Sequence, residues 1–143
     1  MYAIFVNEDG GVPYAKAIVQ GYKPIETRTR NMLGKLVGHR VAVVRTRRGK
    51  RPMMIGYVDI VSAEYQTAEW LDAHRDLTLI PEGSKHDCTG KGKWCYTLAN
   101  PNEQEPYPLP KWAIRHGRSY CELWGGENYG TENIQSTRVV QQR

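Results

Sequence analysis

The sequence has little cysteine and no long apolar run, and both scarcities narrow the class of protein. Its 143 residues include three cysteines, an odd number that suits a reducing compartment better than a disulfide scaffold. No apolar stretch approaches the ~20 residues that a membrane-spanning helix needs. The first apolar run ends at Val6 and has no positively charged region before it, unlike a secretory signal. We therefore expect a cytoplasmic protein that does not enter a membrane.

The few cysteines also give little sign of a metal site. His86, Cys88 and Cys95 carry ligand atoms, but the Cys-x6-Cys spacing matches no common zinc pattern. A fourth ligand is not evident beside them. We expect neither a metal nor another cofactor.

The composition fits one globular domain with a short tail. The chain is 40% hydrophobic and 24% charged, and its length falls in the usual range of ~100 to 200 residues for one domain. Residues 125–143 lack the apolar content to fold alone. We expect a domain over residues 1–124 and a flexible or appended tail after it.

The positive charge is concentrated in one place. The formal net charge is +5, and five cations in a seven-residue stretch account for all of it: Arg45, Arg47, Arg48, Lys50 and Arg51. This stretch joins two β-prone segments, so we expect a hairpin with a basic tip. A charged hairpin end is ordinarily a solvated surface. Here the density of cations and the absence of acids make phosphate contacts and a solvated surface equally expected.

Hydrophobic patterning predicts an α+β fold with short elements. Strands are expected over residues 2–6, 25–30, 41–46, 53–61, 93–98, 111–115 and 119–124. A helix of about two turns is expected within residues 13–21, and a second helix after the capping residue Thr67. Gly56 inside a strand predicts a bulge or a close backbone approach. The prolines of residues 101–110 exclude a helix there, and residues 85–93 form a polar loop able to cover a pocket.

Candidate catalytic and binding side chains are most concentrated between Gly21 and Arg30. Pro24 ends any helix, and the following residues alternate with the two-residue period of a strand. Glu26 and Arg28 therefore share one face, and Thr27 is expected on the other. Isolated charges on a strand are usually solvated, but here opposite charges lie two residues apart and Lys23 precedes them in the turn.

These residues resemble a known signature. The segment Gly-Tyr-Lys-Pro-Ile-Glu-Thr-Arg, residues 21–28, resembles the Gly-x-Lys-x-x-Glu-x-Arg signature of ASCH domains, a branch of the PUA-like superfamily. Residues 55–60 and 108–123 resemble a core strand and the closing segment of the same family. The resemblance implies a small PUA-like β-barrel with flanking short helices. It also implies a cleft whose floor carries Lys23, Glu26 and Arg28.

For function, the resemblance implies RNA binding, and some members hydrolyse the amide of N4-acetylcytidine or cleave RNA. In the amidohydrolase members a threonine three residues after the lysine is the nucleophile. That position is Glu26 here, so the nucleophile does not carry over, although Thr27 is adjacent.

Two main readings of the site stay open, and whether the protein is an enzyme stays open with them. In the first, Glu26 accepts a hydrogen bond from an exocyclic amine while Lys23 and Arg28 donate to carbonyl or phosphate oxygens of RNA or a nucleotide. In the second, Lys23 with Glu26 or Thr27 hydrolyses an acylated nucleoside or RNA. Arg115 and Ser119 are candidates for the rim of the cleft. A third reading is an acidic protein partner for the basic surface.

Overall fold

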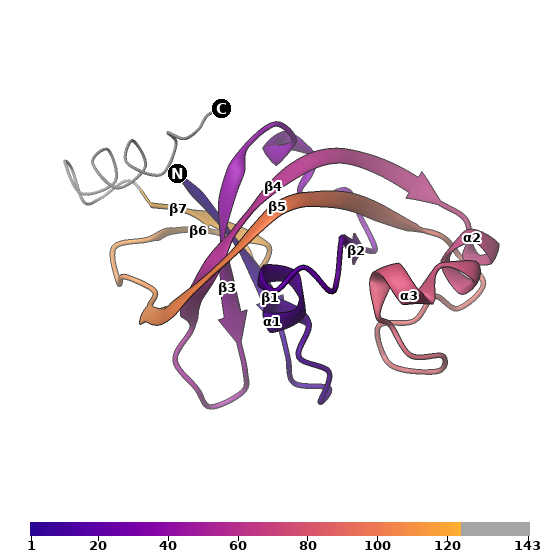
Figure 1. The fold of residues 1–143 in the computed structure, drawn as a ribbon, viewed down its shortest axis with the longest axis horizontal. Coiled ribbons are helices and arrows are strands. Elements are labelled where there is room, and N and C mark those ends of the chain that lie inside the picture. Colours follow the sequence, from indigo (N-terminus) through magenta and orange to yellow (C-terminus); the bar gives the residue numbers. More distant parts are fainter. Residues whose placement is uncertain (124–143) are drawn as a thin grey trace.

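A curved mixed sheet of seven strands forms the body of the structure, a computed structural model that describes residues 1–123 (Figure 1). The strands are β1 (Tyr2–Asn7), β2 (Ile25–Arg28), β3 (Arg40–Thr46), β4 (Met53–Gln66), β5 (Lys93–Pro108), β6 (Ile114–His116) and β7 (Tyr120–Glu122). Their order in the sheet is β2-β5-β4-β3-β1-β7-β6. The α+β class is confirmed. The sheet is open, with β2 and β6 at its two edges, so the predicted barrel is not confirmed.

All strand pairs are antiparallel except β1 with β3, and this parallel pair lies in the middle of the sheet. Side chains of β1 alternate between two apolar clusters. Ile4 and Val6 face the larger cluster, while Ala3 and Phe5 face the smaller one. Central strands covered on both faces are expected to be apolar in their buried part, as residues 3–6 of β1 are.

The hairpin of β4 and β5 is longer than the sequence predicts. The strands expected over 53–61 and 93–98 extend to Gln66 and to Pro108. In the second half of β5 the prolines are tolerated because β2 pairs only with residues 94–97, which leaves the far edge of β5 unpaired beyond them. A proline at a free edge removes no ladder hydrogen bond.

Four short helices accompany the sheet: α1 (Tyr14–Val19), η1 (Gly34–Leu36), α2 (Ala68–Ala73) and α3 (Arg75–Thr78). The first expected helix is confirmed as α1, which packs against β3, β4 and β5 through its buried side chains. The second is confirmed as α2, whose capping Thr67 hydroxyl accepts from the Trp70 amide at 3.1 Å. The helix α3 lies partly in a segment expected to be loop. Figure 1 shows α2 at the right-hand end of β4 and α3 below the same end of the β4–β5 hairpin.

The close of the domain differs in detail from the prediction. The strand expected over 111–115 is β6, which begins three residues later, and the strand expected over 119–124 is β7. The predicted tail, residues 125–143, lies outside the described residues. Within residues 1–123, no helix has both the length and the apolar character needed to cross a membrane.

Candidate functional site

A cavity of about 240 Å³ lies where β1, β2, the start of α1 and the loop after α3 meet. Its lining combines charged, polar and apolar side chains. The lining residues are Phe5, Val6, Asn7, Tyr14, Lys23, Glu26, Thr27, Arg28, Thr29, Ile80, His86, Lys93 and Arg118. The cavity therefore collects the three signature residues together with groups from distant parts of the chain.

Lys23 is held in the wall of this cavity by three acceptors. Its side chain is 2% exposed, and Nζ donates to the carbonyl of Ile25 at 2.8 Å and to the carbonyl of Thr78. The third neighbour is Oε1 of Glu26 at 3.6 Å. A protonated lysine has three N–H donors and no acceptor. This geometry is that of an ammonium group which fastens β2 to α3 and faces Glu26.

Glu26 and Arg28 share a face of β2, as strand alternation predicts. Oε2 of Glu26 accepts from Nε of Arg28 at 3.0 Å, and the guanidinium also donates to the carbonyl of Phe5 at 2.7 Å. Since the second contact is to β1, Arg28 bridges the edge strand to the centre of the sheet. The carboxylate of Glu26 is thus held between one lysine and one arginine.

Burial and charge act against each other in this cluster. Burial alone would raise the pKa of Glu26, but the positive charges of Arg28 and Lys23 outweigh it and hold the pKa below its ordinary value. Burial lowers the pKa of Lys23, and the carboxylate of Glu26 opposes that shift. The cluster therefore contains an ionised Glu26.

Thr27 also lines the cavity, together with Thr29. Strand alternation places the Thr27 side chain on the face opposite Glu26, and the cavity nevertheless reaches this residue. The strand β2 is an edge strand, paired on one side only, with β5.

The cavity lining also includes His86 and Lys93, which the sequence did not single out as site residues. Lys93 donates from Nζ to the carbonyl of His86, and the His86 ring meets the Tyr14 ring edge-on with 5.6 Å between centroids. Burial, helped by Lys85 and Lys93, lowers the pKa of His86. Its Nε2 is buried and has no hydrogen-bond partner within residues 1–123. Two residues of the segment 85–93, His86 and Lys93, line the cavity, and Lys93 is the first residue of β5.

Tyr14, expected to be a packing residue, is buried and also lines the cavity, with Nζ of Lys23 5.2 Å from its ring centroid. Arg118 comes from the turn between β6 and β7. In the described part of the chain, no three His, Cys, Asp or Glu side chains gather closely enough to hold a metal ion.

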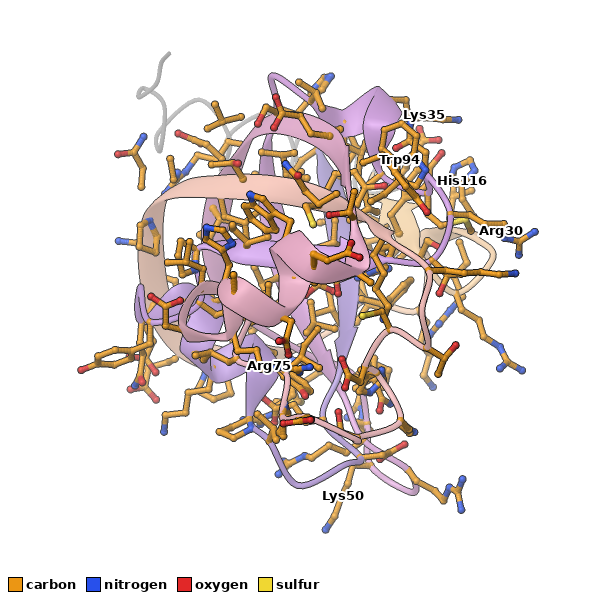
Figure 2. All side chains as sticks on the ribbon, turned by 90° about the vertical axis from the view of Figure 1, so that its right-hand side faces the viewer. Arg30, Lys35, Lys50, Arg75, Trp94 and His116 are labelled. Carbon is orange, nitrogen blue, oxygen red and sulfur yellow. The ribbon has the colours of Figure 1, made fainter. Side chains whose placement is uncertain are left out.

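The other predicted binding residues lie away from the cavity lining. The basic stretch Arg45 to Arg51 joins β3 to β4, and Figure 2 shows Lys50 projecting from the lower end of the molecule. Arg115 lies with its guanidinium carbon 5.0 Å from the centroid of the Phe5 ring. Ser119 is buried, and its carbonyl accepts from the amide of Phe5 at 3.0 Å. Arg118 lines the cavity, whereas Arg115 and Ser119 are not among its lining residues.

Comparisons with known proteins bear on the fold. No family model matches the sequence, and the search of curated proteins gives no match. Among solved structures, the ASCH protein from Zymomonas mobilis matches with a TM-score of 0.67 at 17% identity, over 92% of this chain and 94% of that one. Its serine-to-alanine variant matches with a TM-score of 0.68 at 18% identity, over 92% and 95% of the two chains. Its tyrosine-to-phenylalanine variant matches with a TM-score of 0.67 at 18% identity, over 92% and 97%. This chain therefore has the fold of ASCH-domain proteins.

Proposed function

We propose that the protein binds RNA or a nucleotide through the cavity that contains Lys23, Glu26 and Arg28. The observation that carries this proposal is the meeting of these three groups on one cavity of about 240 Å³. Pockets for drug-sized ligands range from ~300 to 1,000 Å³, so this cavity suits one base or nucleoside. The ASCH fold agrees with an RNA-related role.

Each group of the cluster has a separate part in this binding. Lys23 is committed to Ile25, Thr78 and Glu26, so its part is to orient the carboxylate. Glu26 keeps further lone pairs that accept from the exocyclic amine of a base, since a carboxylate has about four acceptor positions. Arg28 keeps N–H donors for a carbonyl or phosphate oxygen.

Calorimetric titration of the protein with cytidine, uridine, their monophosphates and a short single-stranded RNA tests the proposal. We expect binding of the amine-bearing base and a loss of about tenfold or more in the Glu26→Ala variant, because a hydrogen bond to a charged group is worth roughly 1.5 to 3 kcal/mol. Glu105→Ala, at an exposed position of β5, is the matched control and should bind as the unmodified protein does. Absence of binding to all of these ligands would reject the proposal.

The basic stretch at the β3–β4 turn is proposed as a second contact for longer RNA. Its cations are exposed around Arg47, Arg48 and Lys50, and none of them lines the cavity. Phosphate contacts by lysine and arginine are independent of base sequence. The stretch would therefore strengthen RNA binding without choosing the base.

The alternative function is hydrolysis of an acylated nucleoside or of RNA. Its support is that Thr27, with a hydroxyl group, lines the same cavity as Lys23 and Glu26. The commitment of the Lys23 ammonium to three acceptors weighs against its use as a base. Incubation with N4-acetylcytidine and with labelled single-stranded RNA decides the matter, and turnover no faster than that of Lys23→Ala would reject this alternative.

A further inference from the structure

The cavity holds more positive charge than its one acid neutralises. Its lining includes four permanently or ordinarily cationic side chains and a single carboxylate. The cations are Lys23, Arg28, Lys93 and Arg118, and the acid is Glu26. With His86 neutral, three positive charges remain in surplus.

The surplus is found mainly on Lys93 and Arg118. Lys93 and Arg118 have no ion-pair partner among residues 1–123, whereas Lys23 and Arg28 share the carboxylate of Glu26. The ammonium of Lys93 donates to the carbonyl of His86, a neutral acceptor. Burial lowers the pKa of Lys93, and the negative charge of Glu26, which makes no ion pair with this ammonium, opposes that shift.

His86, whose carbonyl accepts from Lys93, also carries an unpaired polar atom. Nε2 of His86 is buried and has no partner within the described chain. A buried polar atom of this kind is costly unless a ligand or water pairs with it. In the tautomer that carries its proton on Nε2, His86 can donate to an anionic oxygen beside Lys93.

We propose that Arg28, Lys93 and Arg118 form a subsite for a phosphate monoester, so that the ligand is a nucleoside monophosphate or the phosphorylated end of an RNA. This rests on the proposed function and specifies the substrate class of the same cavity. A phosphate monoester carries roughly −1.5 to −2 charges near pH 7 and three strong acceptor oxygens. It therefore balances most of the surplus charge, and the arginine fork matches its geometry. A neutral nucleoside leaves the surplus uncompensated.

The test compares the affinities of cytidine, its 5′- and 3′-monophosphates, a cytidine dinucleotide with only an internal diester, and inorganic phosphate. Calorimetry is performed on the unmodified protein and on Lys93→Met and Arg118→Gln. The matched controls Lys50→Met and Arg47→Gln remove the same charge at the exposed β3–β4 turn. Short RNAs with a 5′-phosphate or a 5′-hydroxyl then distinguish a free nucleotide from an RNA end.

We expect a monophosphate to bind at least about tenfold more tightly than cytidine, as charge-assisted hydrogen bonds would give. Lys93→Met and Arg118→Gln should each remove most of that preference, measured as the ratio of monophosphate to cytidine affinity within the same variant, while the controls keep it. Arg118 is exposed at a turn, so its variant carries the test if Lys93→Met does not fold.

Equal affinity for cytidine and its monophosphates would overturn the subsite and leave the proposed function standing. The subsite would also be overturned if the preference for phosphate survived in Arg118→Gln and Lys93→Met as it does in the controls. Failure of every nucleoside, nucleotide and RNA to bind would overturn the proposed function together with the subsite.

Discussion

Lys23 and Glu26 form a buried ion pair, with 3.6 Å between Nζ and Oε1 and side-chain exposures of 2% and 10%. The same lysine donates to carbonyls in β2 and α3, at Ile25 and Thr78. The pair therefore belongs to the folded framework as much as to the candidate site. Removing one partner of a buried pair leaves an uncompensated charge in the interior.

Replacement of Lys23 by methionine should destabilise the protein. The variant keeps an apolar stem but leaves two backbone carbonyls without their donor and Glu26 with Arg28 alone. Breaking a buried pair costs about 3 to 5 kcal/mol, and a loss of unfolding free energy of this size is expected in urea titrations. Lys50→Met, at an exposed turn, should stay within about 0.5 kcal/mol. A loss in Lys23→Met no larger than in this control would contradict the structural role.

The lowered pKa of Glu26 predicts a loss of stability in acid. Because the folded pKa lies below the ordinary value of 4.5, the unfolded chain takes up a proton at higher pH than the folded one. The stability that ionised Glu26 contributes is full above that value and is lost as the pH falls through the folded pKa.

Between about pH 7 and about pH 3, the free energy of unfolding should fall less steeply in Glu26→Gln than in the unmodified protein. The variant is also expected to be less stable at neutral pH, since Lys23 loses its carboxylate. Glu105→Gln, at an exposed position, should keep the original slope. An unchanged slope in Glu26→Gln would show that other carboxylates carry the acid sensitivity.

Local pattern was enough to predict part of this site. The two-residue period after Pro24 places Glu26 and Arg28 on one face, and their 3.0 Å hydrogen bond confirms it. The apolar spacing that predicts a helix within residues 13–21 also holds for α1. In both cases the local structure depends on residues close together in the sequence, so a sequence pattern can predict it.

The presence of Lys93 and Arg118 at the cavity could not be predicted in this way, because it depends on strand pairing between distant segments. Arg28 pairs with Trp94 in the register of β2 and β5, which brings the adjacent Lys93 to the signature segment. Pairing of β1 with β7 aligns Ile4 with Tyr120, which brings the turn containing Arg118 to the end of β1. Neither register can be read from local periodicity.

A clamp between α3 and the loop that contains His86 should control the mobility of that loop. The carboxylate of Asp87 pairs with both terminal nitrogens of Arg75, each at 3.2 Å, and accepts from the amides of Gly83 and Cys88. Figure 2 shows Arg75 on the helix side of this loop. In Asp87→Ala the two amides should exchange with solvent at least about tenfold faster, as the loss of ~1.4 kcal/mol of local stability would give.

Asp72→Ala is the matched control, because Asp72 also pairs with Arg75 but is exposed and accepts no amide from the loop. Exchange of the Gly83 and Cys88 amides should be nearly unchanged in this variant. Equal exchange in Asp87→Ala and Asp72→Ala would contradict the clamp.

Gly56 should not tolerate alanine, because strand β5 and helix α1 approach it closely. A Cβ at this position would lie 2.2 Å from the carbonyl oxygen of Asn102 and 2.7 Å from Cγ1 of Val19. Register shifts in both pairings of β4 near Gly56 confirm the predicted irregularity. We expect Gly56→Ala to lose about 1 to 3 kcal/mol of unfolding free energy, and Gly10→Ala, with no atom within 4 Å, to lose less than about 0.5 kcal/mol. Similar losses in the two variants would contradict the close approach.

The basic turn between β3 and β4 should affect RNA binding and not nucleotide binding. Arg47, Arg48 and Lys50 are exposed and lie outside the cavity lining, so their joint replacement by alanine removes phosphate contacts only. On single-stranded RNA each lost contact lowers the slope of log affinity against log salt by ~0.7, which gives a decrease of about 2 for three contacts. Binding of cytidine monophosphate should be unchanged.

Lys35→Ala provides the control for a cation elsewhere on the surface, since Figure 2 shows Lys35 at the end of the molecule opposite Lys50. Its salt slope should equal that of the unmodified protein. If the triple variant also kept that slope, the turn would be a solvated surface without phosphate contacts. If the triple variant also lost nucleotide binding, the turn and the cavity would act as one binding site. That result would contradict the prediction that the turn affects RNA binding alone.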